Sequence, residues 1–116
     1  MKKVIVTGGA GFIGSHLTEL LLSREYHVII IDDFSTGKMA NIEPLLKSMK
    51  VDFIQGSITE LPLLQNLFQD VDFVFHQAAL SSVPRSVANP LSTNKVNITG
   101  TLNVLLAARD NNVKKV

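Results

Sequence analysis

The stretch Gly8-Gly9-Ala10-Gly11-Phe12-Ile13-Gly14, a GxxGxxG pattern, decides the fold of this chain through what stands on either side of it. Residues 3–7 before it contain a continuous apolar run and are expected to form a strand with both faces buried. Residues 12–23 after it are expected to form an amphipathic helix. The inward face of that helix is expected to carry Ile13, Leu17, Leu20 and Leu21.

Each spaced glycine has a physical role at such a strand–turn–helix junction. Gly8 permits the tight turn out of the strand, and Gly11, without a Cβ, lets the backbone approach a pyrophosphate. Gly14 is expected to let the helix pack close to the sheet. The helix N-terminus presents N–H groups and about half a positive charge to phosphates. Taken alone, the glycines are equally consistent with a flexible turn.

The following strand supplies the context that favours a dinucleotide site. Residues 27–31 read as a second strand, and Asp32 follows at its end, eighteen residues after Gly14. A carboxylate there accepts hydrogen bonds from the adenosine ribose hydroxyls, although a solvated strand end is the alternative. Asp32 and Asp33 would repel a 2′-phosphate, and the nearest cation is Lys38. The sequence therefore predicts NAD rather than NADP.

The rest of the chain continues to alternate short apolar runs with helical patterns. A loop is expected over 32–37, a short helix within 39–49 with Pro44 near its start, and a strand over 51–55. A helix follows over 60–68 with Thr59 as its N-cap, and then a strand over 72–76.

The last third of the chain is expected to hold a loop over 79–90 and a long helix over 93–110. The inward residues of that helix are expected to be Val96, Leu102, Leu105 and Leu106. Residues 113–116 read as the opening of a fifth strand, cut short. The fold class is therefore α/β, a doubly wound parallel sheet of the Rossmann type, truncated at the start of the fifth strand. One domain spans 1–116, without repeat or linker.

Composition excludes several classes of function. The 116 residues carry a net charge of +1, without the clustered basic face of a nucleic-acid binder. There is no cysteine, which excludes disulfides, thiolate metal sites and a cysteine nucleophile, and suits the cytoplasm. No stretch approaches the ~20 apolar residues of a membrane span. No metal site is expected from the His and carboxylate spacing, and no Gly-Lys-Ser/Thr marks an ATP-binding P-loop.

Four runs resemble the extended short-chain dehydrogenase/reductases. They are TGGAGFIGSHL (7–17), IIDDFSTGK (30–38), FHQAALSSVPRS (75–86) and NPLSTNKVNITGTLNVLLAAR (89–109). The likeness covers nearly the whole chain, and within the family it is nearest to the NDP-sugar 4-epimerases. The loop 81–86 lacks the His and Asp that the 4,6-dehydratases tend to carry there. The resemblance implies the NAD-binding portion of an enzyme acting on a UDP-hexose or UDP-N-acetylhexosamine.

The resemblance also implies roles for individual residues. It assigns the pyrophosphate to Gly8, Gly11, Phe12, Ile13 and Gly14. It assigns the adenosine to Asp32, Asp33, Phe34, Ser35, Thr36, Gly37, Ser57 and Ile58. The middle of the cofactor would be lined by Gln77, Ala78 and Ala79, with Asn97 behind them, and its nicotinamide end or the sugar nucleotide would meet Ser81, Ser82 and Arg85.

Two features qualify that assignment. At the position of Ser57 the family usually places an Asp, which accepts a hydrogen bond from the adenine amine. In this chain the neutral Ser57 hydroxyl would take the place of that charged group. Arg85 is equally consistent with a phosphate-binding side chain and with a solvated loop charge.

The family's catalytic residues are absent from this stretch. The resemblance implies a proton-transferring Tyr with a Lys four residues later, and here the residue four after Tyr26 is Ile30. His16 and His76 are interpreted as structural. No catalytic residue is therefore assigned, and the chain alone is expected to be inactive. The alternatives are a dehydratase, decarboxylase or reductase of the same family, or a non-catalytic NAD-binding module. The intact parent is expected to bind a UDP-sugar and to form a homodimer through the long helix.

Overall fold

The computed structural model describes residues 1–78 and 89–116, and its centre is a four-stranded parallel sheet in the order β3-β2-β1-β4. The strands are β1 (Lys3–Thr7), β2 (His27–Asp32), β3 (Val51–Gln55) and β4 (Phe73–His76). All three pairings are parallel, with Val4 opposite both Val28 and Phe73. After β1 the chain adds β2 and then β3 on one side of β1, and β4 then pairs with the other side of β1. This confirms the predicted doubly wound arrangement.

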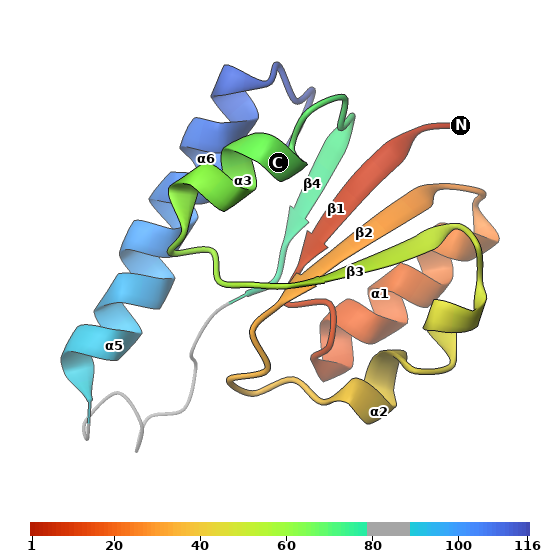
Figure 1. Ribbon diagram of the computed structural model, residues 1–116, viewed down its shortest axis with the longest axis horizontal. Coiled ribbons are helices and arrows are strands. Elements are labelled where there is room, and N and C mark those ends of the chain that lie inside the picture. The colour runs from red at the N-terminus through yellow and green to blue at the C-terminus, as the bar shows by residue number, and fades with distance from the viewer. Residues whose placement is uncertain (79–88) are drawn as a thin grey trace.

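Helices cover both faces of the sheet (Figure 1). One face carries α1 (Phe12–Ser23), α2 (Met39–Ile42) and the 3-10 turn η1 (Leu45–Lys47). The other carries α3 (Leu61–Leu67) and a long helix of three parts. These parts are α5 (Pro90–Asn94), the π-helical turn η2 (Lys95–Gly100) and α6 (Thr101–Asp110).

Alternate residues of the strands feed two separate cores, as the pleat requires. Val4 and Val6 of β1 pack with Leu21 of α1 in the first core. Ile5 of β1 packs with Phe68, at the end of α3, and Val104 of α6 in the second. The unbroken apolar run in β1 is thus explained by burial on both sides.

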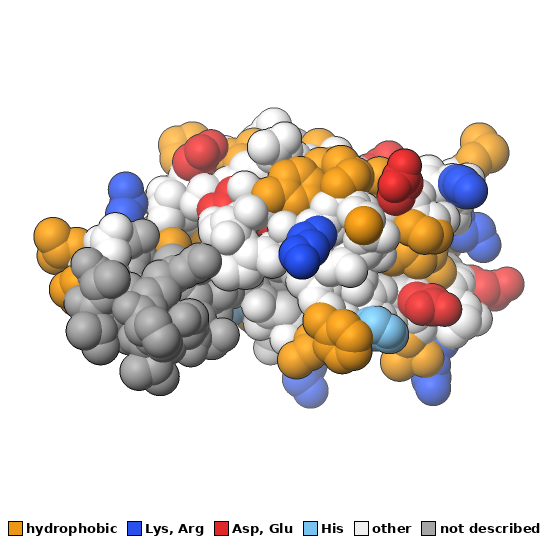
Figure 2. Space-filling model, turned by 90° about the horizontal axis from the view of Figure 1, so that it is seen from below, with side chains coloured by type: hydrophobic (Ala, Val, Ile, Leu, Met, Phe, Trp, Pro, Cys, Tyr) orange, Lys and Arg blue, Asp and Glu red, His pale blue; other side chains and the backbone are white. Residues whose placement is uncertain are grey.

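The predicted inward face of α1 is partly wrong, although Leu21 is buried and Leu17 packs on the first core as predicted. Ile13 and Leu20 are 66% and 52% exposed, and the buried residues are Gly14, Ser15, Thr18 and Leu21. A Cβ on Gly14 would lie 2.3 Å from the Gly8 carbonyl oxygen, so small residues line the contact because the helix approaches the turn very closely. Figure 2 views the molecule from the side of α1 and α2 and shows apolar side chains on this surface.

The predicted inward face of the long helix is partly wrong for the same reason. Leu102 and Leu105 are about half exposed, whereas Val96 packs on the second core as predicted. The buried residues of α6 are Asn103, Val104, Ala107 and Ala108. Small side chains again face the sheet, while Leu102 and Leu105 face outward and Leu106 is half-buried.

Several predicted boundaries also differ. The helix expected within 39–49 is two short pieces, because Pro44 stands between α2 and η1. The N-cap position of α3 is Glu60, and the Thr59 hydroxyl bonds Ser57 instead of capping the helix. The long helix begins at Pro90, earlier than expected, and residues 79–88 of the expected loop lie outside the described residues.

The expected fifth strand is present as a single bridge beside β4. Lys115 pairs in parallel with Phe73, and the Val74 N–H donates to the Lys115 carbonyl at 3.0 Å. Asp72 fixes this edge, because its carboxylate accepts from the Lys3 N–H at 2.9 Å and pairs with Lys114 at 3.3 Å. Among the described residues, no helix has the length and apolarity needed to span a membrane.

Candidate nucleotide-binding cleft

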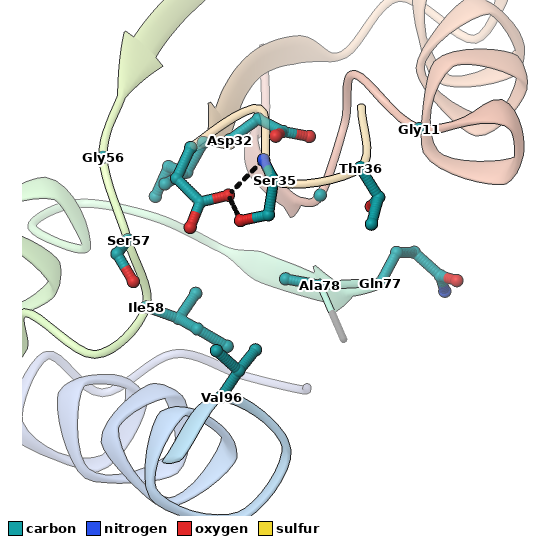
Figure 3. A pocket seen from close by; sticks show the side chains of 13 residues that line it. Gly11, Asp32, Ser35, Thr36, Gly56, Ser57, Ile58, Gln77, Ala78 and Val96 are labelled. Carbon is teal, nitrogen blue, oxygen red and sulfur yellow. Dashed lines mark hydrogen bonds between the residues drawn. The ribbon is translucent and has the colours of Figure 1, made fainter. Parts of the chain in front are cut away.

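A cleft lies at the carboxyl ends of the parallel strands, where open α/β sheets bind ligands (Figure 3). The glycine turn, the loop after β2, the loop after β3, the end of β4 and η2 all contribute to it. The lining residues are Gly8, Gly11, Ile31, Asp32, Asp33, Ser35, Thr36, Gly56, Ser57, Ile58, Gln77, Ala78 and Val96.

The glycine turn has the geometry of a phosphate cradle. Gly8 has φ +70°, and a Cβ there would lie 2.8 Å from the Ala78 backbone nitrogen, so this position requires glycine. Gly11 has φ −75°, and among the described residues its Cβ would meet the Gly8 carbonyl oxygen alone, at 3.3 Å. The space in front of Gly11 is therefore open for a ligand to approach the backbone.

The predicted packing role of Gly14 needs correction. Gly14 packs on the turn at Gly8 and Gly9, while Gly9 makes the close contact with the sheet, where an added Cβ would lie 2.5 Å from the Ile30 side chain. The sequence analysis assigned no role to Gly9.

The N-terminus of α1 faces this cradle without a side-chain cap among the described residues, and its first turn contains no acidic residue. The first N–H groups of a helix lack intrahelical acceptors, so they are available to an anion. The side chains of Phe12 and Ile13 are exposed and do not line the cleft. Any phosphate contact there is made by their backbone.

Asp32 joins the glycine turn to the loop after β2. The residue is 7% exposed, and its carboxylate accepts from the Ala10 N–H at 2.9 Å and from the Phe34 N–H at 2.7 Å. Each oxygen keeps a second lone pair for a ligand hydroxyl. Asp33 is exposed, and its carboxylate accepts from the backbone N–H and the hydroxyl of Ser35. Two carboxylates thus lie at the end of β2 in the cleft lining.

The wall opposite Ser35 and Thr36 comes from the loop after β3 and from η2 (Figure 3). The Asn103 amide of α6 donates to the Ile58 carbonyl at 3.0 Å, and Asn103 is buried. A Cβ on Gly100 would lie 2.5 Å from the Ile58 side chain, so η2 packs directly on this loop. Ile58 and Val96 give the wall an apolar surface, and Ser57 gives it a hydroxyl.

His76, at the end of β4, supports the lining residues Gln77 and Ala78 through the Thr7 hydroxyl. Its Nδ1 lies 2.7 Å from the Thr7 hydroxyl, which accepts from the N–H groups of Gln77 and Ala78, and its Nε2 lies 2.9 Å from the Thr101 hydroxyl. Burial lowers the pKa of His76, so the ring favours its neutral form. The interpretation of His76 as a half-buried structural residue agrees with these contacts.

Of the predicted site residues that the structure describes, most line this one cleft. These are Gly8, Gly11, Asp32, Asp33, Ser35, Thr36, Ser57, Ile58, Gln77 and Ala78. The structure places others beside the cleft but outside its lining, namely Phe12, Ile13, Gly14, Phe34, Gly37 and Asn97. The predictions for Ala79, Ser81, Ser82 and Arg85 lie outside the described residues.

Three lining residues were missed by the sequence analysis. Ile31 is the last residue of the strand predicted over 27–31, and Gly56 directly follows the strand predicted over 51–55, so their positions carried a signal. Val96 was predicted as an inward helix residue, and only the packing of η2 on the loop brings it to the cleft.

Two side chains lie away from the cleft. Tyr26 precedes β2 and packs edge-on against Phe73, near the opposite ends of the strands. His16 is exposed and bonds the Phe12 carbonyl through Nδ1 at 2.7 Å. Within residues 1–78 and 89–116 no group of three His, Cys, Asp or Glu side chains is arranged to hold a metal ion.

A parallel sheet in this order, with a glycine turn after β1 and an acidic residue at the end of β2, defines a Rossmann-type domain. The chain belongs to the family described as GDP-mannose 4,6 dehydratase, whose model matches residues 5–116, among the extended short-chain dehydrogenase/reductases.

The chain is similar to enzymes of three different reactions. The UDP-N-acetylglucosamine 4-epimerase from Methanobrevibacter ruminantium M1 is 44% identical, with a TM-score of 0.90, over 99% of this chain and 36% of that one. DesIV, the dTDP-glucose 4,6-dehydratase from Streptomyces venezuelae with NAD and TYD bound, is 36% identical, with a TM-score of 0.90, over 96% of this chain and 37% of that one. UDP-glucuronic acid decarboxylase 1 of Danio rerio is 37% identical over 93% of this chain and 25% of its own.

The chain therefore spans roughly a quarter to a third of the length of these relatives. The family comprises epimerases, dehydratases and decarboxylases of nucleotide sugars.

Proposed function

We propose that the cleft binds NAD. The observation that carries this proposal is that Gly11, Asp32, Ser57 and Gln77, which are far apart in the sequence, line one cleft at the ends of the strands. The α1 N-terminus and the open space at Gly11 suit a pyrophosphate, and the spare lone pairs of Asp32 suit a ribose diol. The crystallised dehydratase from Streptomyces venezuelae, which holds NAD, supports the same assignment.

The charges of the cleft favour NAD over NADP. The Asp32 and Asp33 carboxylates both line the cleft, and a 2′-phosphate beside them would meet like charge. NADP-binding domains of this fold commonly place an Arg there instead. The described lining contains no Arg or Lys.

We further propose that the chain is the NAD-binding part of a nucleotide-sugar 4-epimerase acting on a UDP-hexose or UDP-N-acetylhexosamine. NAD, when bound, supplies reversible hydride transfer at the sugar C4. The residues of this chain bind and orient the cofactor: the turn holds the phosphates, Asp32 the ribose, and Gln77 and Ala78 the middle of the molecule. The similarity to the Methanobrevibacter ruminantium epimerase supports this choice.

The second candidate function for the parent protein is dehydration or decarboxylation of a nucleotide sugar, because the chain is also similar to a dehydratase and a decarboxylase. Product analysis of the intact protein with a panel of UDP-sugars separates them. Epimerised sugar supports the first proposal, and release of water or CO₂ supports the second.

Calorimetry of this chain with NAD and with NADP tests the cofactor assignment. We expect NAD to bind more tightly, and equal affinities would overturn the preference. We also expect no turnover of UDP-hexoses by the chain alone, because Tyr26, its one tyrosine, lies away from the cleft. The loss of general acid–base catalysis alone costs about 10²–10⁴-fold in rate.

A further inference from the structure

The Ser57 hydroxyl is part of a two-hydroxyl pair at one end of the cleft. Ser57 lines the cleft directly after β3, and its Oγ accepts from the Thr59 backbone N–H at 3.1 Å. The same Oγ lies 2.8 Å from the Thr59 Oγ1, where either atom can be the donor. This contact between the two hydroxyls is partly buried.

The Ser57–Thr59 hydroxyl bond can run in either direction, and each direction leaves Ser57 with a different hydrogen-bonding group for a ligand. A serine hydroxyl has one proton and two lone pairs. When Ser57 donates to Thr59, one lone pair remains after the Thr59 N–H, so Ser57 can accept from a ligand N–H. When Thr59 donates to Ser57, both lone pairs are occupied and the Ser57 proton is available to a ligand carbonyl. The same atom is thus an acceptor or a donor, while the Ser57–Thr59 bond is kept in both states.

This inference rests on the proposed NAD binding, which places the purine base at this end of the cleft. With the pyrophosphate at the glycine turn and the ribose at Asp32, the base comes next, against Ser57, Ile58 and Val96 (Figure 3). Ile58 and Val96 offer apolar contact to the faces of a planar ring. Ser57 is the lining residue of this wall whose side chain can hydrogen-bond the edge of the base.

We propose that the Ser57–Thr59 pair reverses its direction with the ligand, so that the cleft binds nicotinamide dinucleotides carrying either an amino or a carbonyl group on the purine. A carboxylate at position 57 would be an acceptor in every state and would repel a carbonyl oxygen. The Ser57–Thr59 hydroxyl pair, in contrast, does not discriminate between an amino and a carbonyl group on the purine. The ligand class is therefore hypoxanthine as well as adenine dinucleotides.

The test measures the dissociation constants of this chain for NAD and for nicotinamide hypoxanthine dinucleotide by calorimetry. We expect the hypoxanthine compound to bind within about tenfold of NAD. Ser57→Asp should raise the ratio of the two constants by at least about tenfold, because a charged mismatch replaces a neutral hydrogen bond. Ser57→Ala should weaken both compounds by a similar factor, about 2–10-fold, and leave the ratio unchanged.

The Asp variant is suited to the comparison because an aspartate can also accept from the N–H two residues on, which preserves the turn. Circular dichroism and thermal melting check that each variant is folded. A preference of the unchanged chain for NAD above about tenfold, or an unchanged ratio in Ser57→Asp, overturns the proposal. Failure of the folded chain to bind either dinucleotide contradicts the proposed NAD binding itself and so is a separate, recognisable outcome.

Discussion

The carboxylate of Asp32 accepts a hydrogen bond from the backbone N–H of Ala10 at 2.9 Å, across 22 residues of sequence. The end of β2 is thereby bonded to the turn that follows β1. Gly37 fits closely against the same carboxylate, and the Lys38 N–H and the Asn41 amide both donate to the Ala10 carbonyl. The proposed ribose site and the proposed phosphate site are therefore one connected structure.

Replacement of Asp32 by Ala is expected to affect both binding and stability. NAD affinity should fall by about 1–3 kcal/mol, the effect of leaving a charged hydrogen bond unmade. The melting temperature should also fall, because Ala10 and Phe34 lose the acceptor of their N–H groups. Calorimetry and thermal melting measure the two effects. Asp33→Ala is the matched control, since that carboxylate is exposed and bonds Ser35 nearby, and it should lose little stability. Unchanged NAD affinity in Asp32→Ala would falsify the ribose assignment.

Gly11 and Gly14 should respond to substitution in opposite ways. Gly11→Val is expected to abolish NAD binding and keep the fold, because Gly11 has negative φ and its Cβ position is open apart from the Gly8 oxygen at 3.3 Å. Gly14→Ala is expected to destabilise the fold, by about 1–3 kcal/mol, because its Cβ would lie 2.3 Å from that same oxygen. Circular dichroism follows the fold and calorimetry the binding. If Gly11→Val bound NAD normally, the turn would not be the phosphate site.

The contacts of His76 fix its neutral tautomer. The Thr101 hydroxyl donates to the Asn97 carbonyl, so it accepts from a proton on Nε2 of His76. The Thr7 oxygen already accepts from Gln77 and Ala78, so its proton points to Nδ1. A second proton on the ring would leave the Thr7 hydroxyl without an acceptor within this network. Geometry and burial therefore both favour the neutral ring.

Stability is expected to fall in mild acid because of His76. Its pKa is lowered in the folded state, so below the usual value of 6.5 the unfolded chain binds a proton that the folded chain does not. The free energy of unfolding therefore decreases as the pH falls through 6.5 towards the folded pKa. Denaturant titrations between pH 7.5 and 5 should show this loss, and it should be smaller in His76→Gln. Equal slopes in the wild type and His76→Gln would contradict this account.

The long helix is expected to mediate self-association. Its exposed Ile98, Leu102 and Leu105 follow one another at steps of four and three residues, which places them along one stripe. Exposed apolar stripes of this kind favour pairing with a second copy. Light scattering across a concentration series should show a dimer, and Leu102→Glu with Leu105→Glu should give a monomer. Leu20→Glu, at an exposed leucine of α1, should leave the dimer intact. A monomer at high concentration for the unchanged chain would contradict the association.

The sequence alone determined the order and type of most elements and the main part of the cleft. The run before Gly8, the glycine pattern and Asp32 are local signals, because strand burial, turn conformation and the end of a strand are each set by neighbouring residues. In parallel sheets the carboxyl ends of strands meet at one edge. Asp32 could therefore be assigned to the site of the glycine turn from the residues themselves, whereas Ser57 and Gln77 were assigned to it through the family resemblance.

The tertiary structure decided which helix faces are buried and which partners the polar side chains have. Hydrophobicity placed Ile13, Leu20, Leu102 and Leu105 inward, but the sheet and the turn select small residues because the helices approach them closely. The pairs Asp32 with Ala10, His76 with Thr101 and Asn103 with Ile58 join residues that are 22, 25 and 45 positions apart. Such contacts depend on how separate elements dock, and no local pattern in the sequence records the distance between their surfaces.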